Sequence, residues 1–117
     1  MSDDTLEYTV RRHVDGQTVT ATVIGEWGAL SDGSLPAQLH ALLEEGFRNI
    51  IIDATRLAFC DSSCLGALVG LHQATAARGG SLQVAATPYA VRRPMALTGL
   101  DQVIQITDSA DESARSR

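Results

Sequence analysis

Hydrophobic and polar residues alternate in the first part of the chain. Residues 6–13 alternate well enough for a strand, and residues 18–24 are rich in β-branched side chains. Between them lies Asp15-Gly16, a pair that tolerates the positive φ angles of a two-residue turn. The pattern therefore predicts an antiparallel hairpin.

The hydrophobic spacing changes to a helical period after residue 33. Residues 25–33 contain three glycines, and we expect them to form a loop. Ser34 is then the expected helix N-cap, with Pro36 in the first turn. Apolar residues follow at helical spacing, and Gly46 ends the helix. They are Leu35, Leu39, Leu42 and Leu43.

A continuous apolar run, NIIID, comes next at residues 49–53. Such a run after a helix predicts a central strand that is buried on both faces. Residues 56–61 are expected to connect it to a second helix, which begins near Ser62 and ends at the glycines after Arg78. With about 100° per residue, one face of this helix is expected to pack on the core. It carries Leu65, Leu68, Val69, His72 and Ala76.

The last third of the chain repeats the scheme of strand and helix. Residues 81–86 predict a strand, and residues 87–98 predict a helix that Pro94 should shorten or bend. Gly99 ends this helix, and a last short strand is expected at residues 103–106.

The resulting order is β-β-α-β-α-β-α-β. This order predicts the α/β class, with a single mixed sheet, a leading antiparallel hairpin and helices packed on it. A length of 117 residues fits one domain. We place that domain at residues 1–108 and a polar C-terminal tail at residues 109–117.

Charge and composition narrow the range of functions. The formal net charge of −5 argues against a nucleic acid or an anionic membrane surface as the main partner. All nine basic residues are arginine, so no lysine can form a Schiff base or act as a general base. The sequence contains no apolar run of about 18 residues, the length that a membrane-spanning helix requires. The acidic N-terminus also lacks the apolar core of a signal peptide. We therefore expect a cytoplasmic protein, in which both cysteines are reduced thiols.

The candidate chemistry is concentrated in the letters DSSCLG at residues 61–66, just where the second helix begins. A hydrolase nucleophile at such a joint has a glycine two residues away on each side, whereas Ser62 has Cys60 and Cys64 there. The histidines lie on other elements or on the core-facing stripe of the helix. We therefore expect no catalytic residue, and the protein is not expected to be an enzyme.

The two cysteines supply fewer ligands than a structural zinc site requires, so no metal and no cofactor are expected. Two small side chains that fill the core are the simplest interpretation. A redox switch stays open, because Cys64 lies at a helix N-terminus, where the pKa of a thiol is lowered. Helix capping alone explains one polar residue of the joint, but not three in a row.

Several motifs in a fixed order resemble the STAS domain family, and within it the bacterial anti-sigma-factor antagonists. They are FCDSSCLG at residues 59–66, the pair Gly79-Gly80, and LTGL at residues 97–100. The resemblance covers about residues 6–108, and the predicted order of strands and helices is similar to that of the family.

The resemblance implies a switch between protein partners. Ser62 matches the serine that is phosphorylated in the family by an anti-sigma factor that is also a serine kinase. The unphosphorylated protein would bind this kinase and free a sigma factor, phosphorylation at Ser62 would switch binding off, and a phosphatase would reverse it. Asp61, Ser63 and Cys64 would be the neighbours of the phosphosite, and Ser63 would be a second acceptor, a helix-cap partner, or both.

The partner is expected to contact a small set of residues, and two positions there depart from the family pattern. The family commonly has Gly-Glu-Leu-Asp after the second strand, whereas Gly28 takes the place of that aspartate here, with Asp32 nearby. Cys64 replaces the motif glycine, and it either packs inward or reshapes the partner surface. Trp27 is either a lid on the core or an exposed anchor. The expected contacts are Ser62, Ser63, Gly66 and Trp27.

Two alternatives to a sigma circuit stay open, because one fold can serve several functions. The first is a STAS scaffold or a transporter-associated regulatory subunit. The second is a module that binds a small molecule or a nucleotide in a cleft near the start of the second helix.

Overall fold

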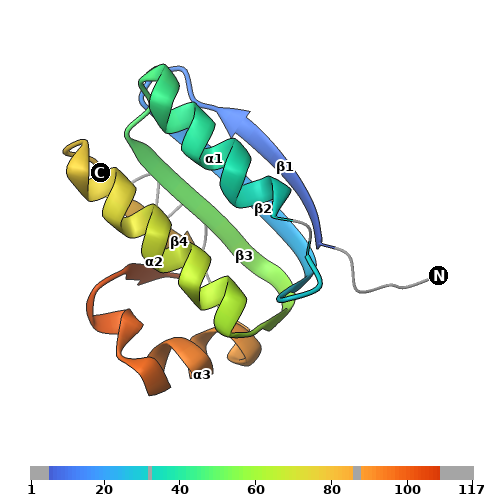
Figure 1. Cartoon of the computed structure of the whole chain (residues 1–117). Coiled ribbons are helices and arrows are strands. Elements are labelled where there is room, and N and C mark those ends of the chain that lie inside the picture. The colour runs from blue at the N-terminus through green and yellow to red at the C-terminus, as the bar shows by residue number, and fades with distance from the viewer. Residues whose placement is uncertain (1–5, 32, 86–87, 109–117) are drawn as a thin grey trace.

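The computed structural model describes residues 6–31, 33–85 and 88–108 (Figure 1). Strands and helices follow in the predicted order, with one 3-10 helix added before the last strand. The predicted tail, Asp32 and Thr87 lie outside the described residues. In chain order the elements are β1 (Leu6–Arg12), β2 (Thr18–Trp27), α1 (Ser34–Glu45), β3 (Asn49–Cys60), α2 (Ser62–Ala77), β4 (Leu82–Ala85), α3 (Tyr89–Thr98), η1 (Leu100–Gln102) and β5 (Gln105–Thr107).

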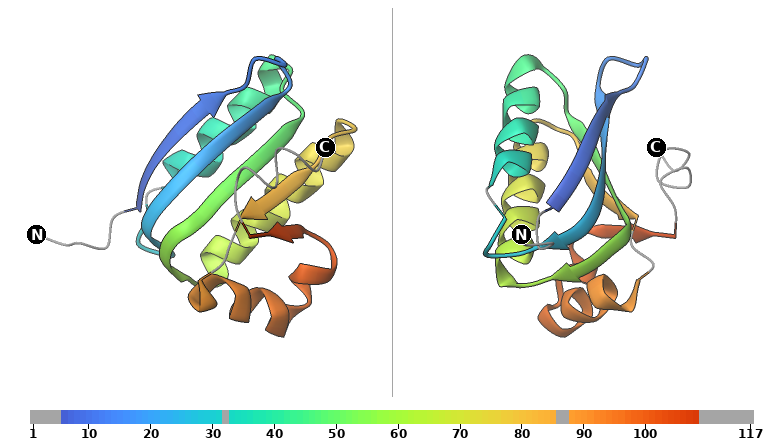
Figure 2. Two further views of the ribbon diagram at one scale, coloured as in Figure 1. Left: turned by 180° about the vertical axis from the view of Figure 1, so that it is seen from behind. Right: turned by 90° about the vertical axis from the view of Figure 1, so that its right-hand side faces the viewer.

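The five strands form one mixed sheet in the order β1-β2-β3-β4-β5. β1 and β2 are antiparallel, and each later neighbour pairs in parallel. The α/β class with a leading hairpin is therefore confirmed. Figure 2 shows α1 and α2 side by side on one face of the sheet, and α3 at the end of the sheet where β3 leads into α2. No helix among the described residues is long and apolar enough to cross a membrane.

The core lies between the sheet and the two helices on its face. The four leucines of α1 are buried, as their spacing predicts. Ile50, Ile51 and Ile52 are all buried, although neighbouring residues of a strand point to opposite faces. The central position predicted for this run, with both faces covered, is therefore confirmed.

Both strands that end at the joint are longer than expected. β2 runs to Trp27, and β3 runs to Cys60, so the predictions of a loop from residue 25 and of a connection over residues 56–61 are wrong at these ends. Parallel pairing of the two strands continues through two register shifts as far as the pair Trp27 and Cys60. These shifts break the alternation of apolar and polar residues along the strands. Because a strand is predicted from that alternation, the sequence does not reveal the strand ends where it is lost.

The starts of the helices also differ from the prediction. Ser34 is the first residue of α1 and not its N-cap, because Gly33 occupies that position with a φ of 79°.

On α2, only Leu68 of the predicted core face is fully buried. The buried face of this helix consists of Cys64, Leu68, Leu71 and Thr75. The helix is thus rotated so that Cys64 points inward, which agrees with one of the two orientations considered for it.

The C-terminal elements are close to their predicted places. α3 continues past Pro94 to Thr98, and Gly99 ends it with a φ of 79°. The last strand is β5 rather than residues 103–106, because η1 shifts the chain and leaves the side chain of Val103 exposed.

Candidate functional site

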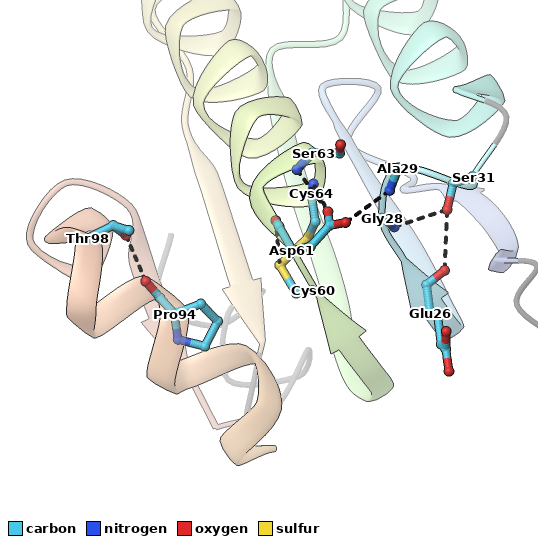
Figure 3. Close-up of a disulfide and its surroundings, with 10 residues drawn as sticks. All are labelled: Glu26, Gly28, Ala29, Ser31, Cys60, Asp61, Ser63, Cys64, Pro94 and Thr98. Atoms are coloured by element: carbon cyan, nitrogen blue, oxygen red, sulfur yellow. Dashed lines mark hydrogen bonds between the residues drawn. A yellow bond between two sulfur atoms is a disulfide. The ribbon is translucent and has the colours of Figure 1, made fainter.

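The joint between β3 and α2 is organised by Asp61. This residue is the N-cap of α2 and has an extended backbone, with a φ of −106° and a ψ of −166°. Its Oδ1 accepts hydrogen bonds from the backbone N–H groups of Ser63 at 2.8 Å and Cys64 at 3.3 Å (Figure 3). Asp61 therefore satisfies two N–H groups that the first turn of a helix leaves without a partner.

The second oxygen of the same carboxylate binds the loop that follows β2. Oδ2 of Asp61 accepts a hydrogen bond of 3.0 Å from the N–H of Ala29, and the N–H of Asp61 donates to the carbonyl oxygen of Trp27 at 3.4 Å. The carboxyl ends of β2 and β3 lie at the same edge of the sheet because the two strands are parallel. One aspartate thus ties the β2–α1 loop to the start of α2.

Gly28 makes this connection possible. A β-carbon at this position would lie 2.7 Å from Oδ2 of Asp61 and 3.1 Å from Cε2 of Phe59. Ser31 fixes the loop from the other side, because its hydroxyl accepts from the N–H of Gly28 and donates to the carbonyl oxygen of Glu26. In this structure, a side chain at position 28 would therefore meet the carboxylate of Asp61.

The protonation of Asp61 follows from these contacts. Burial by itself raises the pKa of this carboxyl, but hydrogen bonds from the N–H groups of Ala29, Cys64 and Ser63 and from its own N–H outweigh it, so the pKa is lowered from its ordinary value. Asp61 is therefore an anion at neutral pH and adds a negative charge beside Ser62.

Ser62 and Ser63 are the first two residues of α2, and both are exposed. Within the described part of the chain, neither hydroxyl makes a hydrogen bond, so both oxygens are open to a partner molecule. Gly66 is also exposed and lies one turn further along the helix from Ser62. The structure thus brings three of the four expected partner contacts together on one surface.

The fourth expected contact, Trp27, is buried beneath this surface, at the bottom of a hollow that Ser63 also lines. Its side chain is 3% exposed and is part of the hydrophobic core. It is the last residue of β2, and it is buried after three partly buried residues of that strand, which the predicted loop did not allow for. The interpretation as an exposed partner anchor is wrong, and Trp27 is a lid on the core.

The two cysteines are joined by a disulfide, with a Cα–Cα distance of 5.3 Å (Figure 3). The expectation of two reduced thiols is therefore wrong for this structure. Cys60 is the last residue of β3, and Cys64 is the third residue of α2. Both side chains point into the core, at a spacing that a disulfide can bridge without distortion of the backbone.

A shallow hollow of about 290 Å³ opens beside Asp61. Two of its residues, Leu30 and Phe59, are exposed apolar side chains, and its charged residues are both carboxylates. It is lined by Glu26, Gly28, Ala29, Leu30, Ser31, Phe59 and Asp61. The charged residues that line this hollow in the described part of the chain, Glu26 and Asp61, would repel a phosphate group.

The histidines lie away from the joint. Nε2 of His13 is 2.7 Å from Oγ1 of Thr20, and His40 lies on α1. His72 is ten residues after Ser62 on α2, which is about 15 Å along a helix. In the described residues, no group of three or more metal-ligating side chains is present.

Comparisons with known proteins agree with the fold. A family model described as "Mlab, STAS domain" matches residues 10–106. An anti-sigma factor antagonist from Mycobacterium paratuberculosis is 23% identical, with a TM-score of 0.87 over 98% of this chain and 96% of that chain. The anti-sigma factor antagonist SpoIIAA in its unphosphorylated form is 22% identical, with a TM-score of 0.75 over 95% of this chain and 96% of that chain.

The phosphorylated form of SpoIIAA, a Bacillus cell fate determinant, has also been solved. It is 21% identical, with a TM-score of 0.74 over 95% of this chain and 100% of that chain. At these identities the likeness shows that the fold is shared.

Proposed function

This chain belongs to the STAS domain family, and from that premise we propose that it is an anti-sigma-factor antagonist that is switched by phosphorylation at Ser62. The unphosphorylated protein binds an anti-sigma factor that is also a serine kinase, and so frees a sigma factor. Phosphorylation ends this binding, and a phosphatase restores it. The chain itself is a binding protein, and the chemistry of ATP belongs to the kinase.

One observation carries this proposal: the hydroxyl of Ser62 is exposed and unbonded in the described structure, next to an aspartate whose carboxylate is fully engaged. A serine that only capped the helix would bond to the N–H groups of the first turn. Asp61 performs that function instead, so the hydroxyl of Ser62 remains available for modification.

A phosphate on Ser62 would change the surface strongly. It carries about −1.5 to −2 charges at neutral pH. The positive end of a helix tolerates an anion, but Asp61 already accepts from the N–H groups of Ser63 and Cys64. The phosphate would therefore add negative charge to a surface that already holds the carboxylates of Glu26 and Asp61.

The consequence for binding is a desolvation penalty and repulsion from any acidic group of the partner. A loss of about 2.7 kcal/mol weakens binding about a hundredfold. Ser63 and Gly66 contact the same partner in this proposal, because they share the exposed surface with Ser62. Asp61 positions the segment and has no catalytic role.

A STAS subunit outside a sigma circuit, such as a scaffold or a transporter-associated regulator, is the second candidate. The observation in its favour is that the matching family model is described as "Mlab, STAS domain" and does not mention sigma factors. Its partner would also bind near Ser62, so the identity of the captured protein distinguishes the two candidates.

The proposal is tested by capture of purified kinases of the anti-sigma class from the source organism with Ser62→Ala and Ser62→Asp variants. We expect Ser62→Ala to retain the kinase and Ser62→Asp to lose affinity at least tenfold. Gln73→Glu is the matched control, because it adds one negative charge at an exposed residue of the same helix, about three turns from Ser62. Equal affinity of all three variants would exclude a switch at Ser62.

A further inference from the structure

The disulfide between Cys60 and Cys64 closes a small ring around the proposed phosphoacceptor. Only Asp61, Ser62 and Ser63 lie between the two cysteines. We propose that this pair is a reversible redox modification site, oxidised by a small-molecule disulfide and reduced by a dithiol, and that its state sets how rigidly the segment with Ser62 is held. The link to signalling rests on the proposed function, whereas the redox site does not.

The ring couples directly to the contacts that order the joint. The disulfide holds the Cα atoms of Cys60 and Cys64 5.3 Å apart, which keeps the first turn of α2 next to the end of β3. The two hydrogen bonds to Oδ1 of Asp61 depend on that placement. The bond from Ala29 to Oδ2 extends the effect to the β2–α1 loop.

Reduction must disturb this arrangement. Two sulfur atoms that are no longer bonded separate to van der Waals contact, about 3.5 Å or more for heavy atoms. Cys60 and Cys64 are 6% and 1% exposed, so dense packing leaves little room for that movement inside the core. The displacement is therefore taken up by the residues of the ring, which include Ser62.

The two cysteines differ in access, and this sets the order of the chemistry. Thiol–disulfide exchange needs an approach to one sulfur, and Cys60 is the more exposed of the two. In oxidation, the Cys60 thiolate attacks a disulfide such as oxidised glutathione, forms a mixed disulfide and releases one glutathione. The Cys64 thiolate then attacks Sγ of Cys60 and releases the second glutathione. Two thiols lose two protons and two electrons, and the glutathione disulfide takes them up.

Reduction runs in the opposite direction. One thiolate of a dithiol attacks Sγ of Cys60, and Cys64 leaves as a thiolate and takes up a proton. The second thiolate of the reductant then attacks the reductant's other sulfur atom, which is bonded to Cys60 in the mixed disulfide. This step closes the reductant's own disulfide and releases Cys60 as a thiolate. In the described structure, Sγ of Cys60 is 4.0 Å from the carbonyl oxygen of Asp61, which can accept the S–H of the reduced residue.

The test uses the protein alone and compares the oxidised and reduced wild type. Amide hydrogen exchange is followed by NMR at Ala29, Ser63, Cys64 and Leu65, after treatment with oxidised glutathione or with dithiothreitol. The N–H groups of these residues donate to Asp61. We expect exchange at these positions to be about tenfold faster in the reduced protein, whereas Leu71 in the middle of α2 changes little.

A titration in glutathione buffers, followed by alkylation and mass measurement, gives the redox equilibrium of the pair. We expect oxidised and reduced forms to interconvert, and the double variant Cys60→Ala/Cys64→Ala not to respond to the buffer. Failure to interconvert, or identical exchange rates in the two wild-type forms, would overturn the proposal. Because no kinase is present, either result is independent of whether Ser62 is phosphorylated.

Discussion

A β-carbon on Gly28 would lie 2.7 Å from Oδ2 of Asp61. The carboxylate of Asp61 can therefore lie where it does because Gly28 has no side chain. That carboxylate also accepts three backbone hydrogen bonds, from Ala29, Ser63 and Cys64. The two residues are 33 positions apart in the chain, since 61 − 28 = 33. Their contact makes the β2–α1 loop and the start of α2 one structural unit.

Substitution of Gly28 therefore disrupts both sides of this unit. We expect Gly28→Ala to reduce the free energy of unfolding by about 1–3 kcal/mol, because an added β-carbon overpacks the site. Gly28→Asp is expected to lose more, because its carboxylate would face that of Asp61. Urea unfolding measures both changes. An Ala variant as stable as the wild type would show that Asp61 can move away without penalty.

The protonation of Asp61 predicts how stability depends on pH. Its folded-state pKa is lowered, so its contribution is fully present above the unfolded-state pKa and is lost as the pH falls through the folded-state pKa. We expect the difference in Tm between wild type and Asp61→Asn to be constant near neutral pH and to disappear in acid. The control, Asp101→Asn on η1, removes the same charge from an exposed residue. A difference in Tm between wild type and Asp61→Asn that persists in acid would contradict this account.

Gly80 is required where the chain passes Arg48. A β-carbon there would collide with the carbonyl oxygen of Arg48, and backbone cannot move aside as a flexible side chain can. We expect Gly80→Ala to destabilise the protein by roughly 2 kcal/mol or more. Gly70→Ala is the matched control, because nothing lies within 4 Å of its added carbon and alanine favours a helix by up to about 1 kcal/mol. Thermal unfolding of the two variants should therefore shift in opposite directions.

The burial of Trp27 can be measured without any variant, because it is the only tryptophan of the chain. A side chain in the core is shielded from water and from quenchers. We expect its fluorescence to be blue-shifted relative to the unfolded protein and to resist quenching by acrylamide. Emission and quenching equal to those of the unfolded chain would place Trp27 at the surface instead.

The sequence predicts the fold well where the pattern is local and periodic. The leucines of α1 and the run Ile50 to Ile52 are buried as expected, and Gly46 and Gly99 end their helices. The pattern fails at the ends of β2 and β3, because register shifts between paired strands interrupt the alternation. Such shifts depend on the neighbouring strand and cannot be read from one segment.

The candidate site shows the same division. A helix N-terminus near Ser62 with a polar cap follows from the residue types, but they do not show that Asp61 and not a serine is the cap. The rotation of α2, the disulfide and the contact of Gly28 with Asp61 do not follow from residue types, because each depends on the distance between segments that only the folded chain defines. The sequence shows only that the two cysteines are four residues apart, and the distance between their Cα atoms depends on the turn from β3 into α2.

The central claim, that Ser62 is the phosphoacceptor, is tested most directly by mapping the phosphate after incubation with ATP and each anti-sigma-type serine kinase of the source organism. Trypsin cleaves after Arg56 and Arg78, so one peptide contains Ser62, Ser63 and Thr75 as its hydroxyl residues. After reduction and alkylation of Cys60 and Cys64, fragmentation between the two serines assigns the site. We predict phosphate on Ser62, retained in Ser63→Ala and lost in Ser62→Ala. Phosphate on Ser63 alone, or on neither serine with every kinase, would contradict the account.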